Sequence, residues 1–253
     1  MEVFLLKTIK NKTMRTFIGI LTLLVISTHL NAQVFTKNIK GNGKLITENR
    51  SLSDYDKIGV TGSFDVILVK GKEGAVSVTA DENLIEYIET EVKNGHLKIQ
   101  PKKGYQLRST KTIVITVSFE MVDAISLAGS GNVRSKDVLN SSDLNLNLAG
   151  SGTLDLQVST KNLTSQIAGS GNIKLSGNSD VLHCEIAGSG NMEGSDLKAT
   201  ASHINIAGSG NVKIHAISEI HAKIVGSGDV IYTGNPTIEK SKSIGSGSIK
   251  KKS

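Results

Sequence analysis

The sequence predicts an all-β fold, namely a single-stranded right-handed parallel β-helix, or β-solenoid, with coils of about 19 residues. Three observations predict it. A Gly-Ser-Gly signal recurs seven times at nearly constant spacing, apolar and polar residues alternate before most copies, and the chain combines 26 glycines with two prolines and no tryptophan. Short strands joined by many tight turns have this composition.

The repeat is defined by the first glycine of each Gly-Ser-Gly signal. Successive copies are 21, 19, 19, 20, 18 and 19 residues apart, which indicates stacked structural repeats. A coil of this length must turn several corners, and glycine tolerates the positive φ that such corners need. The seven structural turn glycines are Gly129, Gly150, Gly169, Gly188, Gly208, Gly226 and Gly245.

Positions counted from that glycine each favour one kind of side chain. The positions two and four places before it are mostly apolar or small, and the positions three and five places before it are mostly polar. Alternation with a period of two predicts strands with one buried face. The position three places after the glycine is small and polar in every copy, and we expect its side chains to form a hydrogen-bonded ladder along the axis. Its members are Asn132, Thr153, Asn172, Asn191, Asn211, Asp229 and Ser248.

Residues 1–32 have the plan of a secretory signal peptide. Four basic residues precede an uncharged apolar run of about 11 residues, and Ala32 marks the expected cleavage site. Met14 is an alternative true start, because the basic and apolar parts of a signal already follow it. A bilayer crossing needs about 20 helical residues, so no transmembrane segment is expected after cleavage.

The segment 33–124 is interpreted as diverged N-terminal coils. The stretch that contains Gly62 and Ser63 resembles a diverged first coil, and the strand at 113–119 is expected to lead into the regular coils of 125–249. Residues 250–253 form a basic tail. Four apolar residues at helical spacing predict a short amphipathic helix that caps the open end of the solenoid. They are Leu84, Ile85, Ile88 and Val92.

Charge and cysteine content exclude several classes of function. The chain has a net charge of +6, but half of that excess lies in residues 1–32, so nucleic-acid binding gains little support. The single cysteine, Cys184, falls in an inward column and is expected to be a small buried hydrophobe. No column presents two acidic residues in adjacent coils. We therefore expect no catalytic residue and no cofactor.

The outward polar face is the candidate binding surface. Repeated side chains offer weak contacts in parallel, which favours an extended ligand from a surface or an envelope component, while low aromatic content predicts modest affinity. The alternatives are a structural or assembly module that forms homo-oligomers and, less favoured, a polysaccharide-active enzyme. The binding-face residues are Asn145, Asn147, Gln166, Glu185, Asn205 and Lys223.

Three histidines form a second constellation. His183, His203 and His221 each lie five residues before their glycine in consecutive coils, so the solenoid stacks them in one outward column. Stacked imidazoles could share a divalent metal, with Glu185 nearby, or sense pH. The favoured interpretation is an ordinary solvated ladder, without metal.

The combination of these features resembles a known family. The stretch from Tyr55 to Gly71, the stretch from Val78 to Ile99 and the repeated Ala-Gly-Ser-Gly-Asn coils are similar to the auto-transporter adhesin head domain family, also called the head GIN domain. The resemblance covers roughly residues 54–235. It implies an exported β-helical domain without an assigned catalytic activity, located in the periplasm, on the outer membrane or outside the cell.

Overall fold

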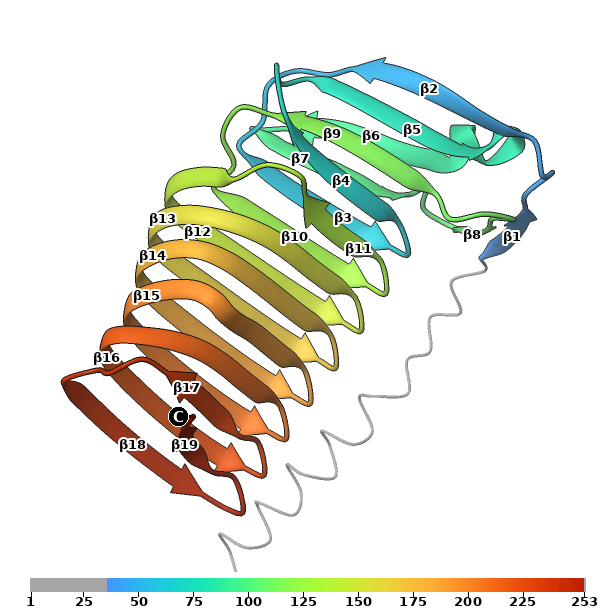
Figure 1. Cartoon of the computed structure of the whole chain (residues 1–253). Coiled ribbons are helices and arrows are strands. Elements are labelled where there is room, and N and C mark those ends of the chain that lie inside the picture. Colours follow the sequence, from blue (N-terminus) through green and yellow to red (C-terminus); the bar gives the residue numbers. More distant parts are fainter. Residues whose placement is uncertain (1–35, 253) are drawn as a thin grey trace, which may run out of the picture. The chain divides into compact units, whose positions relative to one another are not determined.

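The computed structural model describes residues 36–252, which form a β-solenoid of about seven turns spaced by about 19 residues (Figure 1). The predicted fold class is confirmed. Residues 1–32, the expected signal peptide, lie outside the described residues. The regular coils consist of β10 (Ala124–Gly129), β11 (Asn132–Ser135), β12 (Leu139–Gly150), β13 (Thr153–Gly169), β14 (Asn172–Gly188), β15 (Asn191–Gly208) and β16 (Asn211–Gly226).

Successive coils pair in parallel with the glycines in register. Gly150 pairs with Gly169, which pairs with Gly188. The ribbon in Figure 1 accordingly shows the strands of successive coils stacked side by side. Equivalent positions of the repeat therefore form columns, as the sequence predicts.

The interior of the coils is filled by the apolar columns. The residues two and four places before the first six turn glycines, from Gly129 to Gly226, are all buried. Burial of this continuous apolar surface is the main stabilising contribution to the stack. The column two places before the glycine consists of Leu127, Leu148, Ile167, Ile186, Ile206 and Ile224.

Both glycines of each turn are required by geometry. Gly188 has φ of +125°, and a Cβ there would lie 2.4 Å from the carbonyl oxygen of Gly169 in the preceding coil. The second glycine of the same turn, Gly190, faces inward, and a Cβ there would lie 2.5 Å from Cγ2 of Ile167. Close stacking of the coils thus excludes any side chain at either position.

The expected polar ladder is present in part of its column. Nδ2 of Asn191 donates to Oδ1 of Asn172 at 3.0 Å, and Nδ2 of Asn211 donates to Oδ1 of Asn191 at 3.0 Å. Oδ1 of Asn211 then accepts the backbone N–H of Asp229. These side-chain hydrogen bonds link four successive coils, in addition to the hydrogen bonds between their backbones.

Replacement of Asn191 by alanine is expected to destabilise the stack by about 1.5 kcal/mol, because three hydrogen bonds of a partly buried amide are lost. The midpoint of urea unfolding measures the effect. Thr153 occupies the same column, and its side chain makes none of these ladder bonds, so Thr153→Ala is the matched control. Equal midpoints for the two variants would contradict a stabilising ladder.

The N-terminal coils are stacked in an order that differs from their order in the chain. The coil of β3 (Lys57–Gly62) and β4 (Asp65–Lys70) lies between β10 and β11 on one side and β7 (His96–Pro101) and β9 (Val114–Phe119) on the other. The strand expected near residues 113–119 is present as β9 and directly precedes β10 in the chain, but its pairing partners are β4 and β5. It lies against β4, one layer farther out, because β4 already occupies the position beside β11.

Antiparallel strands cover this end of the solenoid. β6 (Ile88–Lys93) pairs with β7, while β5 (Ala75–Asp81) pairs with β9 and with β2 (Leu45–Ser51). Two further strands, β1 (Lys37–Lys40) and β8 (Tyr105–Arg108), form a small parallel sheet of their own.

The predicted helix is confirmed as a short one but ends earlier than expected. It is a 3₁₀ helix, η2 (Glu82–Tyr87), with Leu84 and Ile85 buried, whereas Ile88 and Val92 lie on β6. Asn94 and Gly95 have φ of 53° and 71° and form the tight turn between β6 and β7. This hairpin turn sets the antiparallel pairing and overrides the helical pattern.

One strand of the C-terminal coil, β18 (Ile238–Ile244), is polar where the earlier coils are apolar. The coil also contains β17 (Val230–Thr233) and β19 (Ile249–Lys251). Glu239, Ser241 and Ser243 of β18 stand in register with the buried Ile220, Ala222 and Ile224 of β16. Terminal repeats with polar faces keep a solenoid from exposing its core. Among the described residues, none of the helical segments has the length and hydropathy of a bilayer crossing.

Candidate functional site

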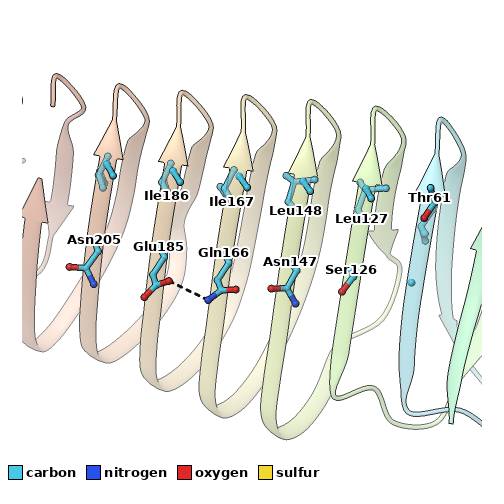
Figure 2. Close-up of a pocket in the computed structure, with 18 of the residues that line it drawn as sticks. Thr61, Ser126, Leu127, Asn147, Leu148, Gln166, Ile167, Glu185, Ile186 and Asn205 are labelled. Atoms are coloured by element: carbon cyan, nitrogen blue, oxygen red, sulfur yellow. Dashed lines mark hydrogen bonds between the residues drawn. The ribbon is translucent and has the colours of Figure 1, made fainter. Parts of the chain in front are cut away.

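A long groove of about 840 Å³ runs along one outward face of the solenoid (Figure 2). We call it the alanine groove, because its floor is the column of residues directly before the turn glycines. These side chains point outward from β10, β12, β13, β14 and β15. The floor consists of Ala128, Ala149, Ala168, Ala187 and Ala207.

The groove exists because the side chains along its floor are smaller than those beside it. The position before the glycine is outward and exposed, since it alternates with the buried position beside it. Alanine in five consecutive coils leaves a hollow with an apolar floor, and longer polar side chains stand on one side of it. With strands about 4.8 Å apart, the seven parallel strands from β3 to β16 extend over about 29 Å.

The polar column beside the floor contains five of the six predicted binding-face residues. Their backbones are in direct register, and Nε2 of Gln166 donates to Oε2 of Glu185 at 3.2 Å. Figure 2 shows the side chains of Asn147, Gln166, Glu185 and Asn205 pointing outward in a row from successive strands. The column is Asn147, Gln166, Glu185, Asn205 and Lys223.

Asn145 is placed apart from the other five. It pairs with Thr164, which pairs with His183, so Asn145 belongs to the histidine column rather than to the groove. Its side chain reaches back to the carbonyl oxygen of Asp123. The five predicted residues that lie three places before a turn glycine therefore share one column beside the groove. Asn145 lies five places before its glycine and belongs to a different column.

The repeat pattern missed the N-terminal end of the groove. Gly59 and Thr61 of β3, with His96, Lys98 and Gln100 of β7, line that end. The alignment of Gly62 with Gly129 could have indicated Thr61, because Thr61 pairs with Ala128. No comparable signal exists on β7, because it does not carry the repeat.

The groove carries few charges, and they are spread along it. Lys98 lies near the N-terminal end, Glu185 lies in the middle and Lys223 lies at the C-terminal end. Between them the polar column offers neutral amides. Such a surface suits a long ligand with an apolar side and scattered polar groups.

The three histidines are adjacent, as predicted. The rings of His183 and His203 are stacked with centroids 4.9 Å apart, and the rings of His203 and His221 are perpendicular with centroids 5.0 Å apart. Partial burial, and then the neighbouring histidines, lower the pKa of His203. The carboxylate beside this column is that of Glu219, whose Oε1 lies 2.8 Å from Nε2 of His221, rather than that of Glu185.

Cys184 is completely buried among the inward side chains, as expected. Burial, with a smaller contribution from the charge of Glu185, raises the pKa of its thiol to about 12. The thiol is therefore protonated at neutral pH and is a poor nucleophile.

Comparisons with known proteins agree with this architecture. The family model described as "Putative auto-transporter adhesin, head GIN domain" matches residues 54–236. A crystal structure of a putative adhesin from Bacteroides fragilis is 26% identical, with a TM-score of 0.78 over 84% of this chain and 99% of that one. A crystal structure of a putative lipid binding protein from Parabacteroides distasonis is 32% identical, with a TM-score of 0.71 over 86% of this chain and 100% of that one. A comparison with curated proteins finds no match.

Proposed function

The chain belongs to the head GIN domain family, and from this premise we propose that it is a non-catalytic binding scaffold of the cell envelope or of the secreted fraction. Its ligand is an extended chain molecule that lies along the alanine groove. The observation that carries this proposal is the unbroken alanine floor, which crosses five consecutive coils in one register.

The groove favours a ligand with a long apolar part. An alanine floor offers methyl groups without hydrogen-bonding capacity, and the amides of Asn147, Gln166 and Asn205 can bind polar groups along one edge. The Parabacteroides distasonis structure with the same fold bears the name of a lipid binding protein. An acyl chain is therefore the first candidate ligand, and a surface polymer is the second.

Titration calorimetry with oleate and with a purified bacterial surface polysaccharide tests the proposal. At least one of them is expected to bind, with modest affinity, because the groove is open and lacks tryptophan. Replacement of Ala168 by tryptophan fills the middle of the floor and is expected to weaken binding by at least about tenfold.

The matched control is Ser159→Trp, which adds the same side chain at an exposed position of the same strand, away from the groove. Its affinity is expected to stay within about twofold of the parent. Equal losses for the two variants, or no binding of either probe, would contradict a ligand site in the alanine groove.

Export follows from the interpretation of residues 1–32 as a signal peptide. The protein isolated from the producing cell is expected to begin at Gln33, after cleavage behind Ala32. Intact-mass measurement of the secreted or envelope fraction tests this. A chain that keeps residues 15–32 and stays in the cytoplasm would contradict it.

Assembly into homo-oligomers is the second candidate function. All residues of β18 are exposed, and Ile238 and Ile244 are 46% and 52% exposed at the last strand of the stack. A terminal strand with free backbone groups can pair with another chain. Sedimentation of the chain over a range of concentrations tests this, and a monomer at all concentrations would contradict it.

A further inference from the structure

Three potential metal ligands converge on the outward face near the C-terminal end of the solenoid. His203 of β15 pairs in register with His221 of β16, and Glu219 lies two residues before His221 on the same face. One ligand atom from each of these three side chains lies within 4.8 Å of the other two. Parallel stacking thus brings together groups from two adjacent coils.

The side chains of His221 and Glu219 lie close together but form no hydrogen bond with each other. Nε2 of His221 is buried and has no hydrogen-bond partner, although Oε1 of Glu219 lies only 2.8 Å from it. A ring nitrogen and a carboxylate oxygen that approach without a hydrogen bond are both free to face a third species. When the imidazole is neutral with its proton on Nδ1, Nε2 and the carboxylate oxygen both present lone pairs, and a cation can bind between them.

We propose that His203, Glu219 and His221 bind one divalent transition metal ion, with zinc(II) as the best fit. Imidazole nitrogen and carboxylate oxygen are ordinary zinc ligands at about 2.0–2.2 Å, which places two ligand atoms of one ion about 3.3 Å apart. Small side-chain rotations close the triangle from its present spacing. Water completes the coordination.

Two neighbouring side chains, His183 and Lys240, lie close to the proposed metal site but are not ligands. His183 is stacked parallel to His203 at 4.9 Å, but it is not one of the three converging ligands. Lys240 is the register neighbour of His221 in the next coil, and its positive charge opposes a cation. Bound zinc would link β15 to β16.

Titration calorimetry of the tag-free chain with zinc chloride, after treatment with a chelator, tests the proposal. One zinc ion per chain is expected to bind and to raise the midpoint of thermal unfolding. Glu219→Gln keeps the shape of the side chain but removes its charge, and it is expected to weaken zinc binding by at least about tenfold.

The matched control is His183→Asn, which removes the third histidine of the column and is expected to change zinc affinity by less than about threefold. Lys240→Gln is expected to strengthen binding, because it removes the opposing charge. Urea unfolding without metal verifies that each variant is folded. Absence of zinc binding, or equal weakening by Glu219→Gln and His183→Asn, would overturn the site.

Discussion

The Gly188→Ala variant is expected to lose about 4 kcal/mol of stability, the largest effect of any substitution considered. Two causes act together. The φ of +125° is a conformation that alanine rarely adopts, and the added Cβ would lie 2.4 Å from the carbonyl oxygen of Gly169. That oxygen belongs to the backbone of the preceding coil, so the clash is relieved only by separating two coils. The urea midpoint measures the loss.

Ser189→Ala provides the control within the same turn. The Ser189 side chain is exposed, so its removal is expected to change stability by less than about 0.5 kcal/mol. A Gly188→Ala variant as stable as Ser189→Ala would contradict the close approach of the Gly188 and Gly169 backbones.

The Asp81→Ala variant is expected to lose about 3 kcal/mol, because four hydrogen bonds to a completely buried carboxylate disappear. The carboxylate accepts the backbone N–H groups of Gly43 and Thr110 and the hydroxyls of Ser109 and Thr110. It thereby fastens two loops to the end of β5. Glu82→Gln, which weakens an exposed ion pair with Lys44, is the control and is expected to leave the urea midpoint almost unchanged.

Asp81 also predicts an acid dependence of stability. Burial alone would raise the pKa of Asp81, but hydrogen bonds from Ser109, Thr110 and Gly43 outweigh burial and hold the pKa well below its usual range. A carboxylate of this kind stabilises the fold fully above its unfolded-state pKa of about 4, and this contribution is lost as the pH falls further. The difference in urea midpoint between the parent and Asp81→Ala is therefore expected to shrink below pH 4. A constant difference from pH 7 to pH 2.5 would contradict this role.

The regular coils could be predicted from the sequence because one physical constraint repeats in each of them. A turn glycine such as Gly188 admits no side chain, an inward residue such as Ile186 must be apolar, and Asn191 must bond its neighbours. Each constraint is local to one repeat and recurs at a fixed spacing. Alignment of the copies was sufficient to find the columns and their register.

The N-terminal end could not be predicted in this way, because its contacts join segments that share no repeat. β7 stacks on β3 and β9 stacks on β4 through long connections, and only the Asn94–Gly95 turn indicates the hairpin of β6 and β7. The role of Asp81 could not be predicted from a sequence pattern either. Its partners lie 28 to 38 residues away in loops.

The candidate sites were predicted in part. The polar column of the groove was predicted from strand alternation. The alanine floor was not predicted, because a small apolar side chain carries no chemical group that indicates a binding site. The histidine column was predicted, while Glu219 was not, although it lies two residues before His221 and in register with Ala201, so strand alternation alone places it on the same outward face.

A crystal structure of the chain grown with oleate is the most direct test of the proposed function. The acyl chain is expected to run across the strands over Ala149, Ala168 and Ala187, with the carboxylate near Lys223 or Lys98. Oleate bound away from the alanine floor, or absent from the groove at saturating concentration, would contradict a groove that holds an extended acyl chain.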